Sequence, residues 1–237
     1  PVHAKMQGRA PEGMDEATTA LFPDSFEDSE LGPMPKGWWI GTLADLATFQ
    51  NGYAFKSKDW SDAGHPVVKI GNVKPGLSSF DGCSYVGSDC VVGLDRFQLR
   101  RGDLLVGMTG YVGETGLVTE VSPAAYLNQR VGRIATSAGV KDLGFVFCLT
   151  RHDDFKAFAE GQSHGSAQAN VSGTDLLKCK RVIPDGKVMS AFNEILEILI
   201  ESIMSNHEQA QSLSAVRDEL LPRLVSGFIN ITEIDNV

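Results

Sequence analysis

The sequence has few of the residues and runs on which several classes of protein depend. Its 237 residues include only four cysteines, none of them in a C-x-x-C pair, and no second ligand pair accompanies Cys148 and His152. A structural zinc site needs about four such ligands, so we expect free thiols in a reducing cytoplasm and no metal. The most apolar run, residues 195–204, is interrupted by glutamates and is too short to span a bilayer. Residues 1–30 have no apolar stretch behind a basic end, so we expect no secretory signal peptide.

Catalytic signatures are also scarce. Residues 161–165 read Gly-Gln-Ser-His-Gly and fit G-x-S-x-G, a pattern in which a hydrolase serine sits on a turn between a buried strand and a helix. Here residues 153–160 have the composition of a charged helix, and no Asp and His follow in the required order apart from His207 within a later helical pattern. A hydrolase acting through Ser163 is therefore only a minor alternative.

Glycines at positions 107, 110, 113 and 116 recur every three residues. No Lys-Ser or Lys-Thr follows them, which excludes a phosphate-cradling nucleotide loop. Two interpretations remain open. One is a tight hairpin in which glycine adopts positive φ. The other is a loop tip that brings the backbone and Tyr111 close to a large ligand.

The net charge of −9 is unevenly distributed along the chain. Residues 1–30 carry 2 basic and 7 acidic side chains, a balance of −5, and residues 183–237 carry 3 and 9, a balance of −6. Residues 31–182 carry 16 basic and 14 acidic side chains, a balance of +2. The middle of the chain therefore has room for a phosphate-binding surface. The basic runs at residues 100–101 and 178–181 could face phosphates, although solvated surface is their default interpretation.

The longest regular pattern is helical and runs from residue 186 to residue 221. Asp185 is a good N-cap residue, Pro222 should stop or kink the helix at Leu221, and Gly227 is placed to cap its C-terminal end. At 1.5 Å per residue the uninterrupted part would be roughly 54 Å long, so we expect it to project from a compact domain. Its seam positions fall alternately three and four residues apart, the period of a helix that packs along another helix. They are Met189, Phe192, Leu196, Leu199, Ile203, Asn206, Ala210, Leu213, Arg217, Leu220 and Leu224.

Two of these seam positions, Asn206 and Arg217, are polar. Polar residues within an apolar seam commonly fix the register and the choice of partner. The alternative is a helix that frays into solvent after Ile203, but the return of Leu213 and Leu220 at the right spacing favours a true seam. We predict that the helix pairs with another helix through Phe192, Leu196, Leu199, Ile203, Leu213 and Leu220.

The middle of the chain has mainly short strand patterns separated by glycine, proline, aspartate and serine. The 42% hydrophobic and 22% charged residues of the whole chain are typical of an ordinary globular protein. A tight turn is predicted at Asn51-Gly52 and a helix at residues 142–160. Strands are predicted at residues 38–42, 48–55, 67–70, 104–108, 117–121, 131–135 and 179–183.

These elements predict the α+β fold class: an irregular mixed α/β domain followed by a long, projecting, coiled-coil-type helix. An acidic leader, residues 1–30, would dock a small aromatic cluster onto a neighbouring surface. The folded domain would span residues 31–183. The long helix with its capped end would occupy residues 184–231, and residues 232–237 would form a tail.

Three polar patches interrupt otherwise apolar segments, at residues 69–72, 127–131 and 168–170. Their Asn, Gln, Arg and Lys side chains are the types that form bidentate hydrogen bonds to base edges in the DNA major groove. Each patch alone also fits an ordinary turn or cap. Because the sequence has no catalytic constellation, we predict that these patches and the glycine-rich loop contact DNA. The predicted contacts are Lys69, Asn72, Thr109, Tyr111, Gln129, Arg130, Gln168 and Asn170.

Several short strings remain, spread over most of the chain. They are LFPDSF (21–26), LG (31–32), PKGW (35–38), NGYAF (51–55), GDLLV (102–106), G-x-x-G (110–113), LNQRV (127–131) and RDELLPRLVSG (217–227). Together, from about residue 17 to residue 231, they resemble the specificity subunits of type I restriction–modification systems. The last string is the most specific, because its order and its place at the end of a long helix both fit.

The resemblance implies a non-catalytic subunit that binds no cofactor directly. Its target recognition domain would read half of a bipartite double-stranded DNA site through the major groove. The long helix would be a spacer that also docks the methyltransferase subunits. S-adenosylmethionine and ATP would be bound by the methyltransferase subunits and by the restriction and translocase subunit, in the prokaryotic cytoplasm. In agreement with this, the sequence has neither a P-loop nor an Asn-Pro-Pro-Tyr-like methyltransferase motif.

A complete specificity subunit usually carries two recognition domains and two spacers, whereas this sequence has one of each. The leader resembles the central linker of such a subunit, so we expect a carboxy-terminal half or a half-subunit. Its helix would pair with a second specificity half or with a second copy of the chain. The competing hypothesis is a protein–protein scaffold with a coiled-coil arm and no DNA contact. Only a DNA reader should lose DNA affinity steeply as salt rises.

Overall fold

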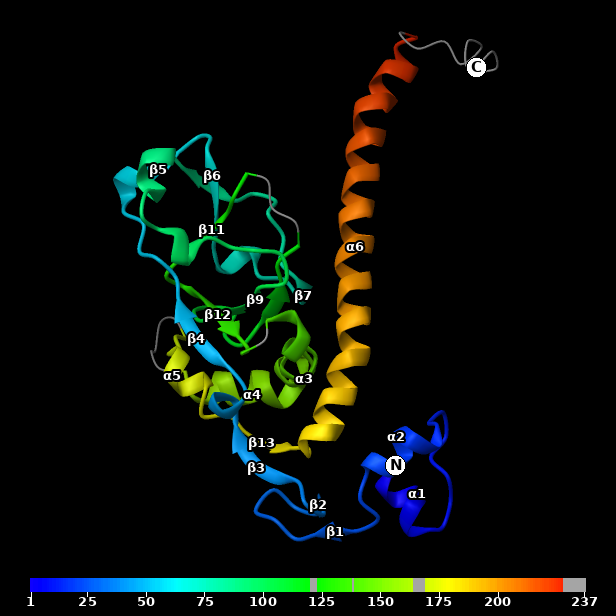
Figure 1. The fold of residues 1–237 in the computed structure, drawn as a ribbon. Coiled ribbons are helices and arrows are strands. Elements are labelled where there is room, and N and C mark those ends of the chain that lie inside the picture. Colours follow the sequence, from blue (N-terminus) through cyan, green and yellow to red (C-terminus); the bar gives the residue numbers. More distant parts are fainter. Residues whose placement is uncertain (120–122, 138, 164–168, 228–237) are drawn as a thin grey trace.

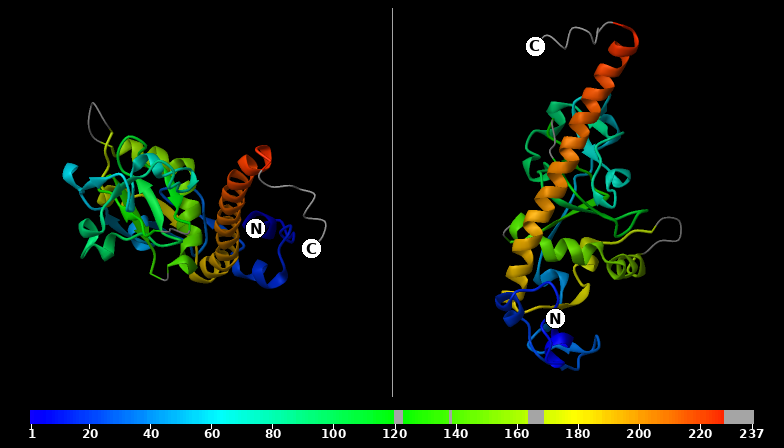
Figure 2. Two further views of the ribbon diagram at one scale, coloured as in Figure 1. Left: turned by 90° about the horizontal axis from the view of Figure 1, so that it is seen from above. Right: turned by 90° about the vertical axis from the view of Figure 1, so that its right-hand side faces the viewer.

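The computed structural model describes residues 1–119, 123–137, 139–163 and 169–227. It consists of a mixed α/β head, a single long helix along one side of that head, and an N-terminal segment folded at the foot of the helix (Figure 1). Two further views show that the upper end of the long helix extends beyond the head (Figure 2). This arrangement confirms the predicted fold class.

Two sheets form the centre of the head. The larger sheet has the order β4-β12-β9-β10-β7, and the smaller has the order β11-β6-β8-β5. The larger sheet comprises β4 (Thr48–Asn51), β12 (Val131–Ala135), β9 (Leu104–Gly107), β10 (Thr115–Leu117) and β7 (Gly76–Leu77). The smaller comprises β11 (Tyr126–Leu127), β6 (His65–Val68), β8 (Ser84–Val86) and β5 (Trp60–Ser61).

Strand β9 lies in the middle of the larger sheet, and all of its residues are buried. Alternate side chains of a strand point to opposite faces. Leu104 and Val106 therefore enter one hydrophobic cluster, while Leu105 enters a second cluster with Val68 and Leu127. Burial on both faces explains why β9 is a continuous apolar run rather than an alternating one.

The first and last strands of the head pair with each other. β3 (Trp39–Thr42) and β13 (Lys180–Ile183) are antiparallel, with Trp39 opposite Ile183. This pairing brings together the two ends of the segment predicted as one domain, residues 31–183, although its limits stay a prediction. A second small sheet joins β1 (Phe26–Glu27) to β2 (Met34–Pro35).

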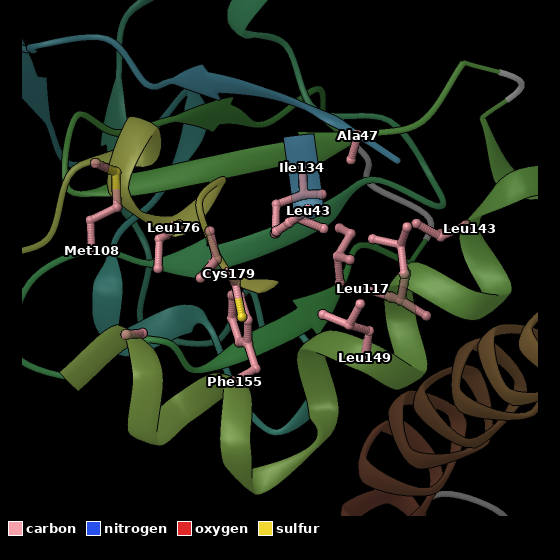
Figure 3. Close-up of a cluster of buried hydrophobic side chains, with 14 of the residues drawn as sticks. Leu43, Ala47, Met108, Leu117, Ile134, Leu143, Leu149, Phe155, Leu176 and Cys179 are labelled. Carbon is pink, nitrogen blue, oxygen red and sulfur yellow. The ribbon is translucent and has the colours of Figure 1, made fainter. Parts of the chain in front are cut away.

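Three helices pack against the larger sheet. They are α3 (Val140–Arg151), α4 (Asp153–Gly161) and α5 (Gly173–Leu176). Side chains from α3, α4 and the sheet meet in the main core, where Phe155 is fully buried (Figure 3). The single helix predicted at residues 142–160 is wrong, because His152 adopts an extended conformation between α3 and α4. Its side chain accepts a hydrogen bond from the Asp154 amide and caps α4.

The predicted strand at residues 48–55 is also too long, and the tight turn at Asn51-Gly52 is wrong. Strand β4 ends at Asn51 and pairs with the distant β12. Gly52 then passes so close to Asn128 that an added Cβ would lie 2.1 Å from the Asn128 carbonyl oxygen. Glycine is needed there for a close approach of two chain segments, not for a hairpin.

The N-terminal segment forms helices α1 (Val2–Met6) and α2 (Glu16–Leu21). The Lys5 side chain joins them by donating to the Thr19 carbonyl oxygen at 3.2 Å. The Phe22 ring lies 6.4 Å from the Trp38 ring, as expected for a leader that docks its aromatic residues. A largely apolar cavity of about 360 Å³ remains between this segment and the foot of the long helix.

The long helix α6 spans Gly186–Val225, which is 40 residues, or roughly 60 Å. The Asp185 side chain accepts from the Lys187 amide at 2.9 Å, confirming the predicted N-cap. Of the stop or kink predicted at Pro222, the stop is wrong: the helix continues through Pro222, and the Ser226 amide donates to the Pro222 carbonyl oxygen. Gly227, with φ of 72°, ends the helix in the left-handed conformation typical of a C-terminal cap. None of the helices in the described ranges is long and apolar enough to cross a membrane.

The first half of α6 packs against α3 and becomes part of the main core. Ile200 and Met204 are fully buried there. The Asn193 side-chain oxygen accepts from the Phe145 amide at 2.8 Å. Leu196, predicted to pair with another helix, instead packs against this core, where it faces Gly144. Position 196 lies one turn from Ile200, so it shares the inward face of the helix.

We predict that Ile200→Ala lowers the free energy of unfolding by about 2–5 kcal/mol, since it removes a fully buried side chain from the α3–α6 contact. Ile198→Ala is the matched control, because Ile198 is 69% exposed on the same helix. The control should change stability by less than about 0.5 kcal/mol. Urea unfolding of both variants measures the difference. Equal losses would mean that α6 is not rooted in the head.

Candidate nucleic-acid interface

Four chain segments meet beyond one end of β9 and are joined by backbone hydrogen bonds. The Met108 amide donates to the Arg130 carbonyl oxygen at 3.1 Å, and the Gln129 amide donates to the Tyr53 carbonyl oxygen at 2.9 Å. The Gly110 amide donates to the Ala169 carbonyl oxygen at 3.1 Å. We call the surface made by residues 51–53, 108–111, 128–130 and 169–171 the four-segment surface.

Gln129 and Arg130 lie exposed on this surface, at a turn that precedes β12. The turn is held from below by Asn128, which is buried. Its side-chain oxygen accepts from the Arg130 amide at 3.3 Å, and its carbonyl oxygen accepts from the Val131 amide at 2.9 Å. The backbone is therefore fixed while the two long polar side chains face outward.

Thr109 and Asn170 connect two of the segments. They form an isolated antiparallel bridge, and the Thr109 hydroxyl donates to the Asn170 side-chain oxygen at 2.9 Å. Asn170 is exposed, whereas Thr109 is buried. Thr109, predicted to contact DNA, therefore supports its neighbour from beneath the surface. Gln168, from the same prediction, lies outside the described residues.

Tyr111 stands at the tip of the hairpin between β9 and β10 and is 67% exposed. Gly110 and Gly113 flank it with φ of 75° and 77°. This confirms the hairpin interpretation of the recurring glycines and agrees with the exposed-tip interpretation. An added Cβ on Gly113 would lie 2.8 Å from Cβ of Ala159, so the hairpin rests closely on α4.

Lys69 and Asn72 do not join this group. The Lys69 ammonium donates to the Ser84 hydroxyl at 2.6 Å and lies 3.9 Å from the centre of the Trp60 ring. Asn72 is only 7% exposed, accepts from the Lys69 amide at 3.0 Å and donates to the Asp81 carbonyl oxygen at 3.1 Å. Contrary to the prediction, Asn72 is an internal cap of a short turn, because its side chain satisfies the backbone that follows β6.

Asn51 is a further residue of this surface that was not among the predicted contacts. Asn51 is exposed at the end of β4, opposite Gly132 of β12, and so borders the turn that carries Gln129. Because Gly52 directly follows Asn51, the sequence predicts a tight turn here instead. Only the register of β4 against β12 places Asn51 beside the four-segment surface.

Several side chains of the basic runs have carboxylate partners. Arg101 donates to Glu201 and Glu208 of α6, and these hydrogen bonds, that to Glu208 first, raise the pKa of Arg101. Lys180 binds Glu30 at 2.7 Å. Lys180 and Glu30 are both largely exposed, in agreement with the default interpretation as solvated surface, whereas Arg101 is partly buried against α6.

The serine and cysteine candidates for catalysis and metal binding lie in settings that do not favour either chemistry. Ser163 follows helix α4 rather than a strand, and its hydroxyl donates to the Glu160 carbonyl oxygen at 2.7 Å, which contradicts a nucleophile elbow. Burial raises the pKa of the Cys83 thiol to about 11, and burial also raises the pKa of Cys148 and Cys179, so these thiols stay protonated near neutral pH. Within those ranges, no group of three or more His, Cys, Asp or Glu residues is arranged to hold a metal.

The family model for the type I restriction modification DNA specificity domain matches residues 35–214. The chain belongs to this family. The match covers both the head of the specificity domain and the part of α6 that packs on it.

Two curated relatives of the specificity domain show how much of a whole subunit it represents. The type I restriction enzyme MjaVIII specificity subunit of Methanocaldococcus jannaschii is 24% identical over 215 residues, which cover 89% of this chain and 51% of that protein. The HindI specificity subunit of Haemophilus influenzae is 22% identical over 201 residues, which cover 83% of this chain and 42% of that protein. The chain therefore spans about half the length of the curated relatives that it matches. Their names agree with the prediction of a specificity module rather than an enzyme.

A solved structure supports the fold. The type I restriction–modification system S subunit from M. genitalium aligns with a TM-score of 0.53 at 15% identity, over 80% of this chain and 46% of that one. At this identity the likeness concerns the fold alone.

We predict that Gly113→Ala destabilises the specificity domain by about 1–3 kcal/mol more than Gly93→Ala. Both glycines have positive φ, of 77° and 75°, so both variants bear the same backbone cost. Only at Gly113 does the added methyl group meet Ala159, whereas nothing lies within 4 Å at Gly93. Urea unfolding of the two variants isolates the contact. Equal destabilisation would show that the Tyr111 hairpin does not rest on α4.

Proposed function

We propose that this chain is the DNA-sequence specificity module of a type I restriction–modification complex and reads one half of a bipartite site. The head, residues 31–183, would contact double-stranded DNA. The observation that carries the proposal is the four-segment surface, where loops from separate parts of a specificity domain present polar side chains on a rigid backbone. Residues 1–30 would be the linker, residues 184–231 the spacer with its capped end, and residues 232–237 the tail.

The chemistry of the surface suits base recognition. Arg130 can donate to guanine in a bidentate manner, and Gln129 and Asn170 can pair with adenine. Tyr111 offers an exposed ring at a hairpin tip. Lys69 stays a weaker candidate, since its ammonium is held between Ser84 and Trp60. These assignments rest on exposure and side-chain type.

The outer face of α6 supports helix pairing. Phe192, Leu199 and Ile203 are exposed beside the face of the same helix that is buried in the head. Further along, Leu213 and Leu220 are also exposed. We propose that this row packs against the helix of a second specificity half, or of a second copy, because the chain spans about half the length of its curated relatives.

The remaining partners follow from the family. We propose that α6 also docks the methyltransferase subunits, and that the restriction and translocase subunit joins the same complex in the prokaryotic cytoplasm. S-adenosylmethionine and ATP would be bound by those subunits and not by this chain.

The first test replaces Gln129 and Arg130 by alanine and maps methylated bases in DNA from cells that also produce the neighbouring methyltransferase subunit. We expect one half of the methylated motif to relax, because each bidentate base contact contributes about 1–3 kcal/mol of discrimination. The matched control replaces Gln7 and Arg9, an exposed pair on the leader, and should leave the motif unchanged.

Two outcomes would count against DNA reading. An unchanged motif in the Gln129 and Arg130 double variant would remove these residues from the interface. If the assembled complex showed no DNA affinity even at low salt, the scaffold hypothesis would replace the proposal, because phosphate contacts make DNA binding strongest at low ionic strength.

The second test concerns pairing. Leu199→Glu with Ile203→Glu should weaken pairing by on the order of a hundredfold or more, since two unpaired charges would be buried in an apolar seam. Gln209→Glu with Gln211→Glu adds the same charge at exposed polar positions of α6 and should pair normally. Sedimentation velocity over a concentration series gives both dissociation constants, and unchanged urea unfolding shows that the head stays folded. The proposal is contradicted if the Leu199→Glu and Ile203→Glu double variant still pairs. It is also contradicted if the wild-type chain stays monomeric at every concentration and with every partner.

A further inference from the structure

Arg101 ties the head to the middle of α6 with three hydrogen bonds. Its Nε donates to Glu208 Oε1 at 2.8 Å, its Nη1 to Glu201 Oε2 at 2.5 Å and its Nη2 to Ser205 Oγ at 3.3 Å. Residues four and three positions apart share one face of a helix, so a single guanidinium spans about two turns of α6. We call this contact the Arg101 clamp.

The turn that carries Arg101 is itself fixed within the head. The Gly102 amide donates to the Val118 carbonyl oxygen at 2.8 Å, and the Arg100 amide donates to Asp103 Oδ2 at 2.9 Å. The same Asp103 carboxylate binds Nη1 of Arg133, on β12, at 2.8 Å. The clamp therefore acts from a rigid support on the central sheet.

Strand β9 connects this support directly to the four-segment surface. It begins after the clamp turn, runs through the centre of the larger sheet and leads into Thr109 and Tyr111. The eight steps from Arg101 to Thr109 span at most roughly 26 Å, the length that a fully extended chain would have. A buried central strand bends little, so a change in the angle at the clamp is passed on to the surface as a whole.

The clamp lies toward the far end of the contact between α6 and the head, beyond the buried Ile200 and near Met204. The contact begins at the foot of the helix, where Asn193 accepts from the Phe145 amide and Leu196 packs over Gly144. From Asn193 to Ser205 is 12 residues, or roughly 18 Å of helix. The apolar contacts of α6 with the core are non-directional, whereas the hydrogen bonds of the Arg101 guanidinium have a fixed geometry. The clamp therefore opposes tilting and rolling of the helix about its foot.

We propose that the Arg101 clamp sets the orientation of the DNA-reading surface relative to the spacer helix, and thereby the number of base pairs accepted between the two half-sites. This inference rests on the proposed function. Arg101 is a positioning residue and contacts α6 rather than DNA. One base pair more or less moves the second half-site by roughly 3.4 Å and turns it by roughly 35°. A head that is fixed on its spacer cannot follow such a displacement without straining its contacts.

The test uses the assembled methyltransferase complex and DNA substrates in which the native spacing is lengthened or shortened by one base pair. The wild-type complex should methylate the native spacing faster than either neighbour by about tenfold or more. In Arg101→Met this preference should fall below about threefold, since the head can tilt to meet the displaced half-site. The recognised half-site sequences should stay the same, which a loss of folding or of base contacts would not allow.

Two further variants separate geometry from charge. Arg100→Met removes the same charge from the exposed neighbouring residue and should keep strict spacing. Arg101→Lys keeps the charge, but an ammonium group cannot span Glu201 and Glu208, so its preference should lie between those of wild type and Arg101→Met. Partly exposed ion pairs contribute little to stability, so all three variants should unfold close to the wild-type urea midpoint.

A second readout needs no DNA. Two spin labels are attached through the substitutions Lys74→Cys in the head and Gln211→Cys on α6. Cys90 and Cys148 are replaced by serine so that they are not labelled. Pulsed electron paramagnetic resonance then measures the distance between the head and the helix. Arg101→Met should broaden that distance distribution and Arg100→Met should not. An unchanged distribution overturns the clamp itself. A broadened distribution with strict spacing overturns its role in half-site spacing, whereas a wild-type complex that methylates no defined motif contradicts the proposed function instead.

Discussion

The close packing of α6 on α3 is the constraint on which the rest of the structure depends. At Gly144 an added Cβ would lie 2.5 Å from Cβ of Leu196, so the two helices can approach this closely only because the residue is glycine. The contact draws Ile200 and Met204 into the same core as Leu104 of the central strand. A spacer helix rooted in the core of the head moves with the head. The distal part of the helix keeps apolar residues such as Leu213 and Leu220 exposed.

The four-segment surface depends on main-chain contacts more than on side-chain packing. Backbone hydrogen bonds join the loops of Met108, Arg130 and Ala169, and buried groups such as Thr109 and Asn128 hold the chain from beneath. The outward side chains carry little of the fold, so they are available to meet a ligand. Such an arrangement suits a recognition surface, because loop residues that a rigid scaffold already holds in place lose little conformational entropy when they bind.

The uneven charge of the chain also acquires a structural role. The acidic α6 supplies Glu201 and Glu208 to Arg101, so part of the charge of the basic head is neutralised within the molecule. This leaves the exposed Arg130 as a cation of the four-segment surface. A net charge of −9 is thus compatible with a local DNA-binding face, because the acidic groups are concentrated on the helix and on the leader.

Local signals in the sequence were sufficient for several elements. The start of α6 at Asp185, its cap at Gly227 and the limits of β12 were all predictable, because caps and strand periodicity depend on residues within one or two turns of each other. Where the local signal was mixed, the prediction failed. The sequence predicts a stop or a kink at Pro222, because proline lacks the backbone donor of a helix interior, yet α6 continues through it to Val225.

By itself, then, the sequence determined the fold class, the long helix and the resemblance to the specificity family. Only the tertiary structure decided which polar residues share a surface, since Asn72 proved to be an internal cap and Asn51 a neighbour of Gln129. It also decided that Leu196 faces the head and that Arg101 binds α6. The reason is physical. Arg101 and Glu201 are 100 positions apart, and a contact of that separation is set by how the sheet and helices pack, which no short stretch of sequence encodes.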